Sequence, residues 1–337
     1  MWVVFSHQSF DWPWPDGRFS LLLRTFMGHG DIGVKIFFVL SGFILTHVYS
    51  TKESLPLKGF FVARFARVYP LYLAGLFVAL PALILIQVPQ ELAHGGHAEV
   101  WTVLVVKSLC VLLLLQAWIP AFANHWNGVS WSLSAEAFFY TCFPFLLPRF
   151  RKMAGRWMLL VLAGALVVEI GREYILQRGG TRNEAAFLMF FPLLRIPDFA
   201  TGMLLKLLHQ RGLRPHPSTA AIAVLALFFG LGPFEKDLIL RCILTQAGSA
   251  WLVLSLAYVP RTSSLLAKAG ILLGQASYGT YLIHQNLRYI STAGMTRIFG
   301  HSMPYPVFLV ALALVSILLY LLVETPARKW IRRRFAG

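Results

Sequence analysis

The chain contains 337 residues, of which 57% are hydrophobic and only 13% are charged, and its formal net charge is +16. A soluble globular chain has about a quarter of its residues charged and less than half apolar, so this composition excludes a disordered chain and argues against a soluble domain. It also argues against a nucleic-acid-binding protein, because long apolar runs leave little solvated surface for the positive charge. We therefore interpret the sequence as an all-α, polytopic integral membrane protein.

Long apolar runs predict the membrane-spanning helices, because a helix that crosses the hydrocarbon needs roughly 20 mostly apolar residues. Residues 1–5 are apolar, but Asp11 follows too soon for a full span, so we expect a truncated first helix. With this partial helix included, we predict about ten transmembrane crossings. The other apolar windows are residues 32–49, 68–88, 101–119, 131–148, 157–174, 186–208, 218–233, 239–259, 270–291 and 306–325.

Basic residues in the connecting loops predict the orientation of the chain. The clusters in 52–67 and 149–156 both have cytoplasmic character, yet strict alternation of spans would place them on opposite sides. We therefore predict that window 101–119, which contains Lys107, is re-entrant or interfacial. Inner loops then carry about twice the Lys and Arg of outer loops, which favours cytoplasmic termini and a single transmembrane domain over 1–337. The basic residues that this orientation places in outer loops are Arg18, Arg24, Arg172, Arg178, Arg182, Lys236, Arg241 and Arg297.

Ionisable residues within the apolar windows are costly to place in a membrane and are often functional. Glu169, Lys206 and Glu324 lie near the ends of their windows, so we expect their side chains to reach the membrane surface. Arg195 and Asp198 are three residues apart and share a helix face, which fits either an ion pair or the wall of a polar cavity.

Two ionisable residues, Glu136 and His284, lie inside apolar runs without a sequence-local partner. Hydroxyl and aromatic residues adjoin both of them, so each is a candidate general acid or base in a polar cavity. A lone histidine at a membrane boundary, such as His7, is more often structural. Arg64 and Arg67 share a helix face, which suits a phosphate-bearing ligand because guanidinium groups pair with phosphate oxygens. Anchoring by inner-side basic residues is the alternative.

Several segments together resemble the membrane-bound acyltransferase-3 family of O-acyltransferases. In chain order they are GVKIFFVLSGFI (residues 33–44), RFARVYPLY (64–72), WSLSAEAFFY (131–140), SYGTYLIH (277–284) and ETPAR (324–328). They follow the family order and extend over nearly the whole chain. Lys35 departs from the pattern, since relatives often have an acidic or neutral residue there.

The resemblance implies a multi-pass enzyme of the bacterial cytoplasmic membrane. It would transfer an acyl group, commonly acetyl, from acyl-CoA to a hydroxyl of a cell-surface polysaccharide, an oligosaccharide or a small metabolite. The implied partners are acyl-CoA, this acceptor and the lipid bilayer, with no metal and no nucleic acid. A membrane transporter or lipid-handling protein is an alternative, because charges within the membrane also mark transporters.

The resemblance also implies the site residues. In the family, an Arg on the first helix precedes a His that activates the acceptor hydroxyl or carries the acyl group, and His7 matches that His. The Arg would precede Met1, so we expect a truncated sequence or a late start, and otherwise an inactive scaffold. The implied catalytic residues are His7, Glu136 and His284, and the implied acyl-CoA-binding residues are Arg64, Arg67, Tyr69, Trp131 and Ser132.

Overall fold

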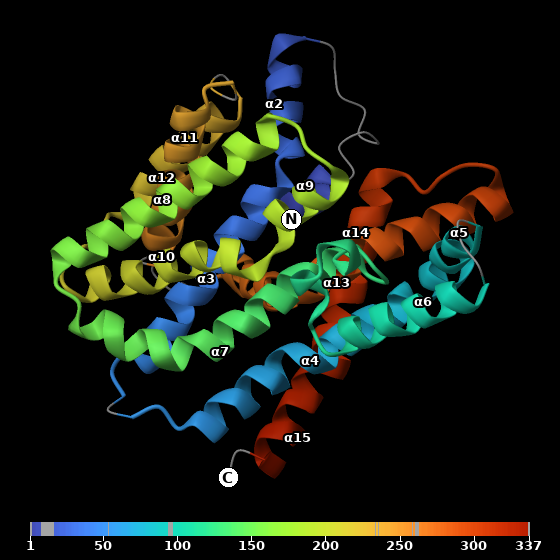
Figure 1. The fold of residues 1–337 in the computed structure, drawn as a ribbon, viewed down its shortest axis with the longest axis horizontal. Helices are drawn as coiled ribbons and strands as arrows, with labels where there is room; N and C mark the ends of the chain where they lie inside the picture. Colours follow the sequence, from blue (N-terminus) through green and yellow to red (C-terminus); the bar gives the residue numbers. More distant parts are fainter. Residues whose placement is uncertain are drawn as a thin grey trace. The chain divides into compact units, whose positions relative to one another are not determined.

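The structure, a computed structural model, describes residues 2–7, 17–52, 54–93, 97–232, 234, 236–257, 259 and 263–335. The regular secondary structure of these residues is helical, as the sequence predicts (Figure 1). Asp11, on which the prediction of a short first helix depends, lies outside the described residues.

The described residues form two compact units, each made of two separate stretches of the sequence. The first unit combines Pro56–Ser134 with Thr262–Gly337, and the second combines Trp2–Leu55 with Ala135–Arg261. The single domain expected from the sequence stays a prediction.

Helices of the first unit are joined by unusual turns. Two π-helical turns, η1 and η6, continue the α-helices before them, and three short 3₁₀ turns fill the connection from Gln116 to Ser130. The helical elements of this unit are α4 (Leu57–Ala82), η1 (Leu83–Gln87), α5 (Val88–Ala93), α6 (His97–Leu112), α13 (Leu265–Phe299), α14 (Tyr305–Leu319), η6 (Tyr320–Glu324) and α15 (Thr325–Phe335).

The second unit is built around α3 and α10. Helix α7 (Trp131–Lys152) begins in the stretch assigned to the first unit and continues into this one. The other helices of this unit are α1 (Trp2–Ser6), α2 (Arg18–Gly28), α3 (Gly30–Tyr49), α8 (Gly155–Gln177), α9 (Arg182–Phe190), α10 (Pro192–Gln210), α11 (Ala220–Leu231) and α12 (Leu238–Leu256).

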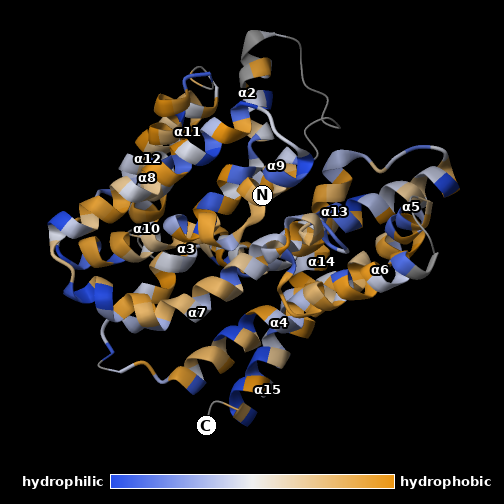
Figure 2. Cartoon of the chain, in the orientation of Figure 1, coloured by the Kyte–Doolittle hydropathy of each residue, from blue (hydrophilic) through white to orange (hydrophobic). Residues whose placement is uncertain are grey.

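Each apolar window of the sequence contains a helix. Among the described residues, 5 helices are long and apolar enough to cross a membrane. Figure 2 shows hydrophobic residues along most of α6 and α11 as well, although these two helices are shorter. The prediction of about ten crossings and of two cytoplasmic ends stays a prediction. The long apolar helices are Gly30–Tyr49, Leu57–Ala93, Arg182–Gln210, Leu238–Leu256 and Tyr305–Phe335.

The structure interrupts two of the windows. Helix α6 ends at Leu112, inside window 101–119, because Leu114 adopts a left-handed conformation with φ 58°. The Leu115 N–H then donates to the Cys110 carbonyl at 2.7 Å, as in a Schellman motif. Window 186–208 is divided between α9 and α10 at Phe191, since Pro192 disfavours helical backbone in the residue before it.

Helices α3 and α10 cross closely enough that their backbones touch. A Cβ on Gly42 would lie 2.0 Å from the Phe199 carbonyl oxygen, and a Cβ on Gly202 would lie 1.8 Å from the Val39 carbonyl oxygen. Small residues allow such a crossing, which maximises van der Waals contact between helices. The crossing fixes the register of α3, the helix that carries the first family-like segment.

Candidate functional site

Glu136 is buried on α7 in the second unit, with 5% of its surface exposed. The Ser41 hydroxyl on α3 donates to its Oε1 at 2.9 Å, and the Tyr140 hydroxyl, one turn along α7, donates to the same oxygen at 2.5 Å. The Phe38 and Phe139 rings meet edge to face beside them, with centroids 5.0 Å apart. The segments 33–44 and 131–140 therefore form one polar centre inside an aromatic wall.

His7 directly follows α1, and its side chain is exposed. Helix α1 packs against α3, and it does so closely, because a Cβ on Gly30 would overlap the Ser6 side chain. Trp2 anchors the other end of α1 by donating from its indole to the Phe26 carbonyl at 3.1 Å. His7 therefore lies beside the first turn of α3.

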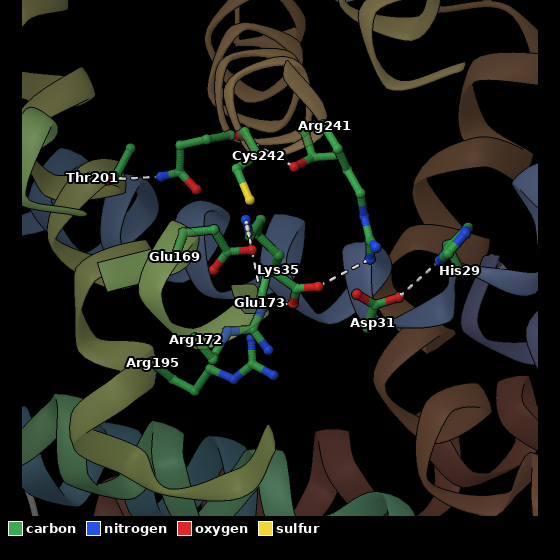
Figure 3. A network of polar contacts seen from close by, with 12 residues as sticks. His29, Asp31, Lys35, Glu169, Arg172, Glu173, Arg195, Thr201, Arg241 and Cys242 are labelled. Atoms are coloured by element: carbon green, nitrogen blue, oxygen red, sulfur yellow. Dashed lines mark hydrogen bonds and ion pairs between the residues drawn. The ribbon is translucent and has the colours of Figure 1, made fainter. Parts of the chain in front are cut away.

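A network of ion pairs is buried between α3, α8 and α12 in the second unit (Figure 3). Lys35 contacts Glu169 at 2.6 Å, and the Arg172 guanidinium contacts the same carboxylate oxygen at 2.9 Å. Arg172 also contacts Glu173 at 2.7 Å, and Arg241 contacts the other oxygen of Glu173 at 3.1 Å. Each carboxylate therefore has two cations around it, which offsets the cost of burying it.

This network corrects the predictions made from the sequence for Glu169, Arg172 and Arg241. Glu169 does not reach the membrane surface: it is 7% exposed and paired with Lys35. Arg172 and Arg241 are not outer-loop residues, because they lie in α8 and α12 and join the network. Lys35, the departure from the family pattern, is the cation that Glu169 balances.

Sequence reasoning did not identify the network as a unit. A signal was present, because Arg172 and Glu173 follow Glu169 by three and four residues, and residues at these spacings are neighbours on one helix face. Nearby on α10, Arg195 is 4% exposed and donates from Nε to the Met189 carbonyl at 2.9 Å. Arg195 thus satisfies a carbonyl at the end of α9.

The first unit contains a second charge cluster, around Glu324. This residue closes the π turn η6 and is completely buried. Arg67 on α4 forms an ion pair with it, and Arg328 on α15 lies 3.5 Å away. The Glu324 side chain is therefore paired inside the protein, and the prediction that it reaches the membrane surface is wrong. Lys206, in the second unit, is 6% exposed; its Nζ lies over the Phe43 ring and 3.3 Å from Nδ1 of His209, near the end of α10.

Three family-like segments meet at this Glu324 cluster. The Arg67 guanidinium lies over the Tyr278 ring, 5.7 Å from its centroid, and the Tyr278 hydroxyl donates to the Val68 carbonyl at 3.0 Å. Tyr69, two residues after Arg67 on α4, donates to the Leu112 carbonyl at 3.0 Å and so holds the end of α6. Arg64 precedes Arg67 by one turn on α4, and its side chain is partly exposed.

His284 is completely buried on α13. Its Nδ1 lies 2.7 Å from the Tyr281 carbonyl oxygen, so Nδ1 carries a proton and Nε2 is the basic nitrogen of the neutral ring. The Tyr281 hydroxyl is hydrogen-bonded to Ser132 at 2.8 Å. Trp131 and Ser132, at the start of α7, are both buried beside this contact. The structure thus connects His284 with Ser132 through Tyr281.

The predicted site residues are divided between the units. The second unit holds His7 and Glu136, and the first holds Arg64, Arg67, Tyr69, Trp131, Ser132 and His284. Within the described residues, no group of three His, Cys, Asp or Glu side chains is arranged to hold a metal ion.

Comparisons with known proteins agree with the resemblance. The Acyltransferase MdmB of Streptomyces mycarofaciens is 28% identical, over 90% of this chain and 82% of that protein. The Exopolysaccharide production protein ExoZ of Rhizobium meliloti (strain 1021) is 27% identical, over 90% of this chain and 92% of that protein. The Putative acetyltransferase ORF330 of Acidianus two-tailed virus is 24% identical, over 76% of this chain and 72% of that protein. No solved structure matches the chain significantly.

A family model described as an acyltransferase domain matches residues 1–324, which include the first four family-like segments and Glu324. The enzyme class follows from this match and from the relatives: the protein transfers acyl groups other than aminoacyl groups. The chain belongs to the acyltransferase-3 family.

Proposed function

We propose that the protein is a multi-pass membrane O-acyltransferase. It moves an acetyl group from acetyl-CoA to a hydroxyl of a carbohydrate or a small metabolite, and it acts in the bacterial cytoplasmic membrane with both termini in the cytoplasm. The names of two relatives, an exopolysaccharide production protein and a putative acetyltransferase, support this choice of acceptor and acyl group.

The Glu324 cluster is the observation that carries the proposal. Arg67 and Arg328 each keep 33% of their side-chain surface exposed, although the carboxylate between them is buried. A fixed, partly exposed pair of guanidinium groups suits the phosphates of a CoA thioester. Arg64 adds a third cation on the same stretch of α4. Tyr69, Trp131 and Ser132 complete the proposed acyl-CoA site.

The proposed catalytic step is a direct acyl transfer. The His7 imidazole accepts the proton of the acceptor hydroxyl while the hydroxyl oxygen attacks the thioester carbonyl. The carbon–sulfur bond breaks, and the CoA thiolate leaves and is protonated. Glu136, in the same unit as His7, stabilises the charged form of His7 through its negative charge, and His284 is a third proposed catalytic residue, in the first unit. Holding the two substrates together supplies much of the rate.

Transfer of radiolabel from acetyl-CoA in membranes that contain the protein tests the proposal. His7→Ala should abolish transfer, whereas His301→Ala, an exposed histidine between α13 and α14, should leave it intact. Mass spectrometry of surface glycans and extracted metabolites from cells with and without the gene would identify the acceptor. Consumption of acetyl-CoA that does not depend on the protein, or full transfer by His7→Ala, would contradict the proposal.

A further inference from the structure

Ser108 and His125 form a hydroxyl–imidazole pair in the first unit, away from the residues discussed above. Ser108 lies on α6, and its Oγ is 3.2 Å from Nε2 of His125. His125 lies in the irregular connection before α7 and is 6% exposed. A serine hydroxyl within hydrogen-bond distance of an imidazole is the basic arrangement of nucleophilic acyl transfer.

The backbone around His125 is held in place from two sides. Its own N–H donates to the Phe122 carbonyl at 3.0 Å. The backbone of the next residue, Trp126, forms two hydrogen bonds with the Gln87 side chain: the Trp126 N–H donates to Gln87 Oε1 at 2.8 Å, and Gln87 Nε2 donates to the Trp126 carbonyl at 3.2 Å. The Trp126 indole donates to the Leu76 carbonyl at 3.0 Å. A residue supported in this way keeps the geometry that catalysis needs.

The environment of His125 keeps its imidazole neutral. Burial is the main cause that lowers the pKa of His125 to about 4, and the positive charge of Lys107 lowers it further. Glu91 opposes this effect and forms an ion pair with Lys107. Within the described part of the chain, Lys107 and Glu91 are the charged groups that act on His125. The imidazole is therefore neutral at neutral pH, and its Nε2 can accept a hydrogen bond from the Ser108 hydroxyl.

Ser108 also lines a pocket of about 270 Å³ between η1 and α6. The other lining residues are apolar, among them Leu83, Trp101, Leu104 and Leu112. A volume of this size equals roughly nine liquid waters at about 30 Å³ each, which is ample for a short acyl chain. Apolar walls with a single hydroxyl suit an acyl group and disfavour a saccharide.

We propose that Ser108 accepts the acyl group covalently, with His125 as its base. The Ser108 oxygen attacks the thioester carbonyl of the acyl donor while its proton passes to His125 Nε2. The carbon–sulfur bond breaks, and the CoA thiolate leaves with the proton that His125 returns. The product is an acyl-serine ester. An acceptor hydroxyl then attacks this ester through the same base, and the Ser108 hydroxyl is restored.

This inference rests on the proposed function for its acyl donor, but it differs from direct transfer in its intermediate. An O-acylserine survives acid denaturation, whereas an acyl-imidazole formed on His7 hydrolyses readily. The test therefore incubates the purified full-length protein with radiolabelled acetyl-CoA, quenches it with acid, and locates the label by peptide mass mapping. We expect an acetyl group on the peptide that contains Ser108.

Variants separate a catalytic role from a structural one. Ser108→Ala and His125→Gln should each remove more than nine-tenths of the trapped label. The matched control Ser291→Ala, a partly buried helical serine that bonds only to the Arg288 carbonyl, should retain it. His7→Ala should keep the label on Ser108. Each variant is first checked for wild-type elution on size exclusion.

The outcomes distinguish the two proposals. Full transfer by Ser108→Ala, or label mapped elsewhere, overturns the acyl-serine while the proposed function stands, and the contact is then only a structural link between α6 and the loop. Absence of both label and transfer in the wild-type protein overturns the proposed function.

Discussion

The two charge clusters have the same local design, with one carboxylate between two cations, but they differ in exposure. Around Glu169, the side chains of Lys35 and Arg172 are 1% and 3% exposed. Around Glu324, Arg67 and Arg328 are both 33% exposed. The first arrangement satisfies its charges internally and has no surface to offer a ligand. The second uses a buried carboxylate to hold two cations at an accessible surface.

The comparison therefore assigns different roles to similar ion pairs. Removal of one partner from a fully buried pair leaves an uncompensated charge in a medium of low dielectric constant, which is strongly destabilising. Partly exposed charges remain hydrated and contribute little to stability, so they are available to an anionic ligand. Substitutions in the Glu169 network should therefore mainly lower stability, and substitutions in the Glu324 cluster should mainly weaken substrate binding.

Lys35→Met should produce the largest loss of stability. The substitution leaves Glu169 with one cation, so we expect the free energy of unfolding to fall by about 3–5 kcal/mol. The double variant Lys35→Met with Glu169→Gln should recover much of this loss, because both charges are removed. Arg328→Met, the matched change in the Glu324 cluster, should cost less, because the Arg328 guanidinium is partly exposed and Arg67 still pairs with Glu324. Equal losses of stability for Lys35→Met and Arg328→Met, measured by thermal unfolding, would contradict the different roles assigned to the two clusters.

Glu136→Gln tests a buried carboxylate of a third kind, one that accepts hydrogen bonds from Ser41 and Tyr140. The amide oxygen can still accept from both hydroxyls, so we expect nearly normal folding. The rate of acyl transfer should fall about 100-fold or more, because the charge that acts on the base is lost. A variant with normal activity would show that Glu136 is structural. Tyr140→Phe should have a smaller effect on the same assay.

Arg64→Ala should raise the KM for acetyl-CoA about tenfold, which corresponds to the loss of one charged hydrogen bond. Arg67→Ala combined with Glu324→Gln should act similarly, since the second change avoids a buried unpaired carboxylate. Arg297→Ala, an exposed arginine on α13, is the control. Steady-state kinetics at two salt concentrations would measure the effect. An unchanged KM would show that the Glu324 cluster does not bind acyl-CoA.

The lowered pKa of His125 should make the stability of the protein depend on pH, and we expect this effect to be smaller than those above. Its pKa is about 4 in the folded protein, below the ordinary histidine value of 6.5 that applies to the unfolded chain, so the unfolded chain binds the extra proton more readily between these values. Stability should therefore decline as the pH falls from 6.5 towards 4. His125→Gln should flatten this part of the curve of melting temperature against pH. An unaltered curve would show that His125 is not protected from protonation.

Local patterns in the sequence were sufficient to predict the helices but not their ends. Apolar runs determine where a helix can be buried, and every predicted window contains one. Pro192 could have divided window 186–208, since the signal is local. The end of α6 could not be predicted, because leucine rarely adopts the left-handed conformation that Leu114 has.

The candidate site shows the same limit. Family-like segments predicted candidate residues for it, and this choice stays a prediction, but they did not predict what these residues contact. Lys35 and Glu169 are 134 residues apart in the chain, so no local pattern joins them. The Ser108–His125 pair went unnoticed for the same reason, because it depends on how the connection after α6 folds back.

The π turn η6 makes chain length as important as residue type. It lets α14 pack against α13 while α15 packs against α4. A π turn holds one residue more than an α-helical turn can accommodate. If η6 became a regular α-helix of unchanged length, everything beyond it would rotate by about 100° relative to α14. Leu312 and Ile331, both buried, could then not both keep their present neighbours. Deletion of Val323 would instead remove the extra residue, so a relative with a one-residue gap between these positions should have a regular helix and the same arrangement of the arginine pair.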